Sequence, residues 1–174
     1  MSNSSSSFPS IYSLNREKQQ LEVLVDLKDM ASIQGLALDK KENRLYFADY
    51  RFGLHVLDLR TKVITKLQND TPHPLKAIDG LYFWKKSLIA IHNGTNPFRV
   101  VKYTLDSQGE RVVSYEFVEK ALPEMNEPTL GVVHKDNFYY IVNSPWGAYD
   151  RENNFLPAKA DSPKVRMINL KVIE

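Results

Sequence analysis

A short pattern, in which a variable residue precedes a glycine and an apolar residue, recurs along the chain and most constrains its fold. The three copies are Gln34-Gly35-Leu36, Asp79-Gly80-Leu81 and Leu130-Gly131-Val132. Their spacing of about 45 to 50 residues is typical of β-propeller blades with four short strands each. A glycine here lets the innermost strand of a blade approach its neighbours closely. A sandwich would also contain many short strands, but it would not repeat this pattern.

The residues between the glycines predict strands and little helix. Runs of β-branched, aromatic and leucine residues are broken by turn residues, with almost no helical periodicity. We therefore expect an all-β chain, a partial β-propeller of three to four antiparallel blades. The expected blades are 11–27 with two strands, 33–67 and 78–118 with four, and 129–172 with three. Residues 1–10 are expected to form a flexible Ser-rich tail before a domain spanning 11–174. We expect a loop at 68–75 and a long insert at 143–163.

Composition excludes several classes of function. The chain has no cysteine, which rules out disulfides, zinc–thiolate centres and cysteine nucleophiles. Its 23 basic and 21 acidic residues give a net charge of +2, which argues against nucleic acid as a partner. No apolar run approaches the ~20 residues that span a bilayer, so no membrane partner is expected. The Ser-rich start lacks the features of a signal peptide, so the default expectation is a cytoplasmic protein.

The repeat also predicts where a ligand would bind. The residue before each blade glycine should lie at the mouth of the central channel, and Asn93 and Asn143 end corresponding strands of two blades. We therefore expect a ring of polar residues there: Gln34, Asp79, Asn93, Thr129 and Asn143. A carboxylate such as Asp79 is a good ligand for a hard cation. The alternative is that it caps backbone N–H groups at the start of a strand.

Three further residues have two interpretations each. His92 ends an apolar strand, where it either contacts a ligand or hydrogen-bonds within the fold. Arg99 either meets an anionic group of a ligand or is solvated. Trp146 lies on the long insert and either covers the channel or fills a gap between blades. By contrast, the Asp49-Tyr50 and Asp58-Leu59 pairs are interpreted as turn residues that hydrogen-bond locally.

The segment from Ser32 to Asp150 resembles the superfamily of senescence marker protein, gluconolactonase and luciferin-regenerating enzyme. The resemblance rests on "IQGLALDKKENRLYFADYRFGLHVLDL", "AIDGLYFWKKSLIAIHNGTNPFRVVKYTLD" and "NEPTLGVVHKDNFYYIVNSPWGAYD". The last two pieces are similar to one bacterial subgroup. The resemblance covers about two-thirds of the chain and implies a six-bladed propeller of about twice this length, with this chain as its C-terminal half.

The resemblance implies a divalent metal, calcium before others, and a hydrolase acting on lactones or related esters. Asp79 and Gln34 would then be metal ligands with Asn93 in support, and His92 a catalytic proton shuttle. Small-molecule substrate contacts would come from Arg99, Thr129, Asn143 and Trp146. Leu130 departs from the pattern, because leucine cannot bind a metal. Two alternatives stay open: a non-catalytic binding or scaffold propeller, and a homodimer in which two chains close one ring.

Overall fold

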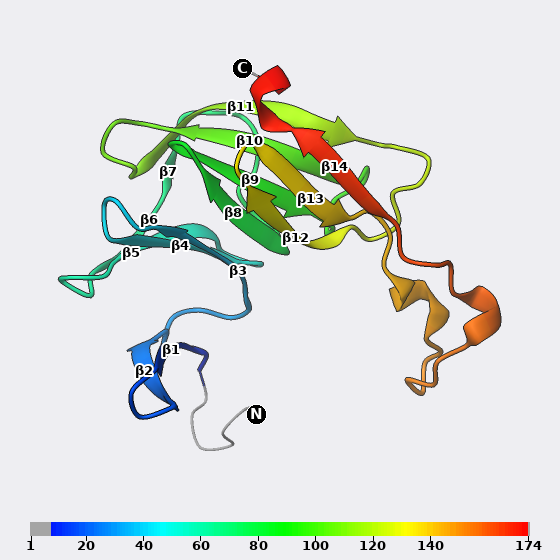
Figure 1. Cartoon of the computed structure of the whole chain (residues 1–174), viewed down its shortest axis with the longest axis horizontal. Coiled ribbons are helices and arrows are strands. Elements are labelled where there is room, and N and C mark those ends of the chain that lie inside the picture. The colour runs from blue at the N-terminus through cyan, green and yellow to red at the C-terminus, as the bar shows by residue number, and fades with distance from the viewer. Residues whose placement is uncertain (1–7, 174) are drawn as a thin grey trace.

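The computed structural model describes residues 8–173 and consists almost entirely of antiparallel sheets (Figure 1). The first blade contains β3 (Ile33–Asp39), β4 (Arg44–Asp49), β5 (Gly53–Asp58) and β6 (Ile64–Lys66). The second blade contains β7 (Gln68–Asn69), β8 (Gly80–Trp84), β9 (Ser87–His92), β10 (Arg99–Leu105) and β11 (Arg111–Lys120). The third contains β12 (Thr129–His134), β13 (Asn137–Ile141) and β14 (Val165–Asn169).

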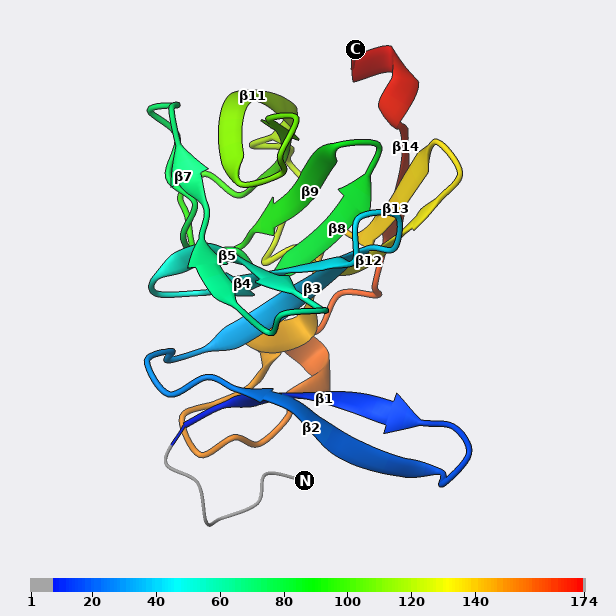
Figure 2. The same cartoon turned by 90° about the vertical axis from the view of Figure 1, so that its left-hand side faces the viewer.

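A two-stranded hairpin of β1 (Ser10–Asn15) and β2 (Gln20–Asp26) precedes the first blade. It lies beyond that blade, on the side away from the other two (Figure 2). The tail expected at residues 1–10 falls mostly outside the described residues, and β1 already begins at Ser10. The sheet order confirms the expected all-β class and the partial propeller of antiparallel blades.

The innermost strands of the three blades, β3, β8 and β12, lie side by side (Figure 1). Close backbone approach explains the repeated glycine. A Cβ atom on Gly35 would lie 2.3 Å from the backbone nitrogen of Leu81, which no side chain could tolerate. Between β8 and β12, the backbone N–H of Gly131 donates a 2.5 Å hydrogen bond to the Tyr82 hydroxyl.

The core is divided among the blade interfaces, as the propeller architecture predicts. One buried cluster, around Tyr46, Leu81 and Tyr103, joins the first blade to the second. Another, which includes Ile91 and Phe138, joins the second to the third. A smaller one packs the hairpin on the first blade. Each blade is therefore stabilised by its neighbours.

Two segments differ from expectation. The loop predicted at 68–75 begins with the short strand β7, which pairs in parallel with β11 of the second blade. The last strand ends at Asn169 and continues as the 3-10 helix η3 (Leu170–Ile173). The insert at 143–163 contains two more short 3-10 helices, η1 (Pro145–Ala148) and η2 (Pro157–Lys159). Within the described residues, no helix is long and apolar enough to cross a membrane.

Candidate functional site

Polar residues of three blades gather at one end of the sheets, where β8 and β12 begin and β4 and β9 end. Asp79 directly precedes β8, and its backbone N–H continues the ladder by donating to the Ile91 carbonyl at 2.9 Å. The Thr129 hydroxyl donates to Asp79 Oδ2 at 2.6 Å. This hydrogen bond joins the inner strands of the second and third blades and leaves Asp79 Oδ1 for other partners.

Tyr50, from the first blade, also contacts this group of polar residues. It follows β4, and its hydroxyl donates to Asn93 Oδ1, just after β9, at 3.2 Å. Its carbonyl accepts a 2.9 Å bond from the N–H of Ala77. A Cβ atom on Gly94 would lie 2.1 Å from the Tyr50 hydroxyl oxygen. The glycine of the Asn93-Gly94 pair therefore makes room for this side chain, in addition to shaping a turn.

Glu127, in the loop before β12, completes the group. Its Oε2 atom is buried without a hydrogen-bond partner, which is costly for a carboxylate. Burial and then the negative charges of Asp79 and Glu127 raise the pKa of the Tyr50 hydroxyl, so both carboxylates are near enough to act on it electrostatically. We call Tyr50, Asp79, Asn93, Glu127 and Thr129 the mouth site.

Among the described residues, the other residues predicted for the ring form no hydrogen bond with the mouth site. Gln34 is exposed, and its amide donates to the Ser32 hydroxyl at 3.1 Å. Asn143 is buried and holds the base of the insert, because its amide donates to the Ser162 carbonyl at 3.1 Å and its Oδ1 accepts from Lys164 N at 2.8 Å. Trp146 is 65% exposed on η1 and lies against the ring of Tyr149.

His92 belongs to a second polar group, which we call the histidine cluster and which consists of His73, His92, Arg99 and Tyr103. The Tyr103 hydroxyl is 2.7 Å from His73 Nδ1 and 2.8 Å from His92 Nε2, and it donates to the Pro74 carbonyl at 3.1 Å. Because a hydroxyl has one proton, we assign the protons of these two contacts to the imidazole nitrogens.

Arg99 closes the cluster at its solvent side. It donates to the Thr95 hydroxyl at 3.1 Å, and its Nη1 lies 3.4 Å from His73 Nε2. Its guanidinium also lies over the Phe117 ring. The position predicted for ligand contact is thus engaged with protein partners.

Burial keeps both histidines neutral. Burial, with smaller contributions from the neighbouring His73 and Arg99, lowers the pKa of His92 to about 3. It also lowers the pKa of His73, with Arg99 acting in the same direction. His92 is fully buried, and its Nδ1 faces the main chain of Lys76 without a well-formed hydrogen bond. In this conformation the His92 ring is shielded from solvent and cannot exchange a proton with it directly.

The mouth site has the composition of a partial site for a hard cation. Asp79 and Glu127 supply carboxylates, and Asn93 and Thr129 supply neutral oxygens. Calcium takes six to eight oxygen ligands. The mouth site therefore offers the right type of ligand atom but too few ligands for a complete calcium site. Within residues 8–173, no three His, Cys, Asp and Glu side chains are grouped in a way that could hold a metal ion.

Sequence reasoning did not predict Tyr50 and Glu127 as members of this site. The Asp49-Tyr50 pair was interpreted as turn chemistry, and Asp49 does accept bonds from Arg51 N at 2.8 Å and Phe52 N at 2.9 Å. The turn pattern around Asp49 gave no reason to assign Tyr50 a further role. Glu127 stands next to Pro128 in a loop, and the strand pattern gave no indication that its side chain turns inward.

Comparison with known proteins supports the fold alone. No protein-family model and no curated protein matches the chain. Its structure is similar to one in a nidogen/laminin complex, with a TM-score of 0.63 and 14% identity over 92% of this chain and 53% of the other. TolB from Acinetobacter baumannii has a TM-score of 0.60 and 12% identity over 97% of this chain and 37% of its own. A luciferin-regenerating enzyme has a TM-score of 0.57 and 16% identity over 92% of this chain and 52% of its own.

These similarities confirm the β-propeller fold. Sequence identities this low support no statement about function. The chain spans about half, or less, of the length of these solved chains. The likeness to the luciferin-regenerating enzyme, at 16% identity, likewise shows the β-propeller fold alone.

Proposed function

We propose that the protein binds a divalent cation, calcium before others, together with a small-molecule ligand at the mouth site. The observation that carries this proposal is the buried, unpartnered Oε2 of Glu127 near the Asp79 carboxylate and the Tyr50 hydroxyl. Two half-buried carboxylates close together repel, and a buried carboxylate oxygen without a partner is costly. A bound cation would offset both costs, and it would therefore stabilise this arrangement of side chains.

Each residue has a stated role in this proposal. Asp79 and Glu127 provide the charge, while Asn93 and Thr129 provide neutral oxygens. Tyr50 has a raised pKa and stays protonated at neutral pH, so it donates a hydrogen bond to an oxygen and does not act as a base. When bound, the cation would polarise a lactone or ester carbonyl, the reaction class that the sequence resemblance suggests. His92 is buried against Tyr103 and takes no direct part in the mouth site.

Calorimetry with calcium tests the proposal. We expect saturable heat from the parent protein and a loss of affinity of at least about tenfold in Asp79→Asn and Glu127→Gln. Asp161→Asn is the matched control, because Asp161 is an exposed aspartate on the insert. A folded parent protein that gives no heat at millimolar calcium, or variants that bind as the parent does, would contradict the proposal.

A second candidate is a propeller whose ring, and whose cation site, are completed by another copy of the chain. Two uncovered apolar faces favour it. The hairpin exposes Leu14 and Leu21 at 60% and 70%, and the third blade exposes Val132 and Met167 at 55% and 59%. Faces of this kind are usually buried against a partner. Packed face to face around a two-fold axis, two copies would cover both and supply the missing cation ligands.

The solution mass tests this second candidate. The account expects a dimer at twice the monomer mass of 20.1 kDa, reduced to a monomer by Leu21→Glu or Met167→Glu. Lys18→Glu on the same hairpin is the control, because Lys18 lies in the exposed turn between β1 and β2. A folded parent protein that stays monomeric at high concentration would contradict it.

A further inference from the structure

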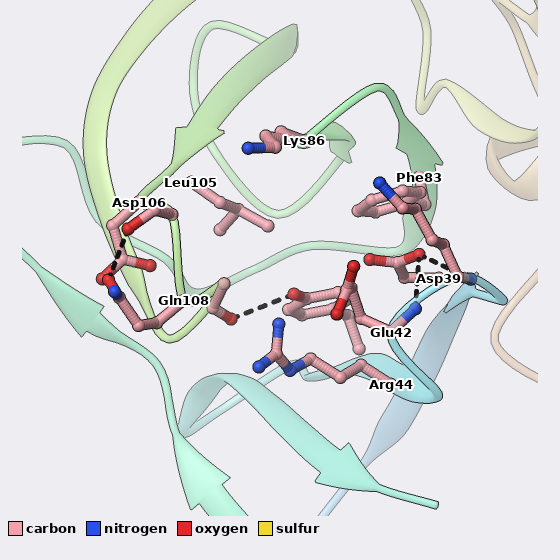
Figure 3. A pocket seen from close by; sticks show the side chains of 12 residues that line it. Asp39, Glu42, Arg44, Phe83, Lys86, Leu105, Asp106 and Gln108 are labelled. Carbon is pink, nitrogen blue, oxygen red and sulfur yellow. Dashed lines mark hydrogen bonds between the residues drawn. The ribbon is translucent and has the colours of Figure 1, made fainter.

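A cavity lies at the opposite end of the blades from the mouth site, where β8 ends and β9 begins. It has a volume of about 310 Å³ and is enclosed by three turns of the first two blades, 40–43, 85–86 and 106–110 (Figure 3). We call it the turn cavity. No step of the proposed function uses it.

The floor of the turn cavity is apolar and firmly held. Tyr46 is almost fully buried, stacks on Phe83 with ring centres 5.8 Å apart and planes 4° from parallel, and donates to the Gly109 carbonyl at 3.0 Å. Burial raises the pKa of Tyr46 to about 12, so its hydroxyl stays a donor. The half-buried ring of Phe83 and the Leu105 side chain face the cavity (Figure 3).

Three cationic side chains line the cavity, and one of them, Arg44, hydrogen-bonds to Tyr46. Lys41, Arg44 and Lys86 line it, and none of the ion pairs among residues 8–173 includes them. Arg44 and Lys86 extend into the opening from opposite walls (Figure 3).

The acidic residues of the lining are mostly engaged. Asp39 accepts hydrogen bonds from Lys41 N at 3.1 Å and Glu42 N at 3.4 Å, and Asp106 accepts from Glu110 N at 2.9 Å. Within the described residues, Glu42 is the one acidic side chain of the lining without a hydrogen bond. The lining therefore carries three cations, which form no ion pair within residues 8–173, and three carboxylates, two of which already accept hydrogen bonds from backbone N–H groups.

We propose that the turn cavity binds a small organic phosphate whose planar apolar part lies on Phe83 and whose phosphate is held between Arg44 and Lys86. A guanidinium donates two parallel hydrogen bonds to a phosphate, and an ammonium adds a point charge. The aromatic floor favours a flat ring over a bare ion. This site does not depend on the mouth site.

The chain provides its own reporter for this binding. Trp84 lines an adjoining cavity that shares Phe83 and Lys86 with the turn cavity. The chain has two tryptophans, and the other, Trp146, is exposed on the insert. In a Trp146→Phe background the emission therefore reports on Trp84. The probes are phenyl phosphate, which carries both parts of the proposed ligand, and inorganic phosphate and phenol, which carry one part each.

We expect a saturable emission change with phenyl phosphate, at a lower concentration than with either single-part probe. Arg44→Gln should weaken the binding about tenfold and Lys86→Gln about threefold, since charge-assisted hydrogen bonds are lost. Arg60→Gln is the matched control, because Arg60 is an exposed turn residue outside the cavity lining.

Either of two results would overturn the proposal: no saturable change with phenyl phosphate, or equal affinity in the parent, Arg44→Gln and Lys86→Gln. Lys86 is exposed in a turn, so its variant keeps the test valid if Arg44→Gln lowers stability. Glu127→Gln at the mouth site should leave phenyl phosphate binding unchanged, so failures of the two proposals can be told apart.

Discussion

The mouth site and the histidine cluster both join polar residues of the second blade to their surroundings, yet their hydrogen bonding differs. In the histidine cluster, Tyr103 bonds both imidazoles and a carbonyl, and Arg99 bonds Thr95. In the mouth site, Glu127 Oε2 is buried without a partner beside a second carboxylate. Buried polar groups that satisfy one another stabilise a fold, whereas a buried carboxylate oxygen without a partner is costly enough to favour a bound ligand; the unbonded Nδ1 of His92 belongs to a neutral ring and costs less. The difference separates a structural cluster from a binding site.

Removing the Tyr103 hydroxyl should have the largest effect on stability. Tyr103→Phe leaves two buried imidazole N–H groups without an acceptor, which should lower the free energy of unfolding by about 2–4 kcal/mol. Urea denaturation measures this, and Tyr12→Phe, at a residue 48% exposed, is the control. If Tyr103→Phe costs no more than the control, the cluster is not a structural element. Calcium affinity should not change.

Acid should destabilise the protein through the same cluster. His73 and His92 have lowered pKa values in the folded state, so the unfolded chain binds more protons below its ordinary histidine pKa. Their contribution is fully present above pH ~6.5 and falls by up to about 1.4 kcal/mol per histidine for each pH unit below that. For His92 the loss continues towards pH 3. Urea midpoints between pH 7 and about pH 5 measure it.

His92→Gln serves as the comparison for the pH series, because glutamine does not titrate and its amide can still donate to Tyr103. This variant should show a shallower pH dependence than the parent. His134→Gln is the control, since His134 is exposed on β12, and it should retain the parent slope. Identical slopes in the parent and His92→Gln would contradict the buried-neutral account.

Filling the space beside Tyr50 should affect the mouth site more than the fold. Gly94→Ala places a methyl group 2.1 Å from the Tyr50 hydroxyl and 2.8 Å from Ala77 Cβ, so the tyrosine must move. We expect a loss of about 1–2 kcal/mol in stability and a larger proportional loss of calcium affinity. Gly147→Ala, where a Cβ would meet nothing within 4 Å, is the control. Equal calcium affinity in both variants would remove Tyr50 from the site.

The smallest expected change in stability is also the most informative about Glu127. Glu127→Gln replaces an unpaired buried charge by an amide, so without calcium the free energy of unfolding should stay within about 1 kcal/mol of the parent or rise. Thermal unfolding with a chelator present measures this. A loss larger than that would mean that Glu127 has a structural partner, as Tyr103 does.

Much of the fold could be predicted from the sequence, because it depends on local pattern and on the repeated glycine. The strands of the two complete blades follow the alternation of apolar and turn residues, and Gly35 is required by close backbone approach. β7 could not be predicted, since its two residues are strand only through pairing with β11. The end of β14 was missed because apolar residues continue into η3.

The candidate site was predictable in position and only partly in membership. Asp79 directly precedes a blade glycine and Thr129 lies two positions before another, and the sequence pattern places both at the channel mouth. Tyr50 and Glu127 reach the site from a turn and a loop, so their roles depend on contacts between blades that no local pattern encodes. The pattern also placed His92 at a strand end without indicating that its ring turns into the core beside Tyr103.

Terbium luminescence would test the central claim most directly, since terbium replaces calcium and is excited by energy transfer from nearby aromatic rings. The account predicts terbium emission excited through the protein, competed away by calcium, reduced in Tyr50→Phe and abolished in Glu127→Gln, with Tyr103→Phe at the parent level. Emission that is absent from the parent, or that survives Glu127→Gln, would show that the mouth site does not hold a cation.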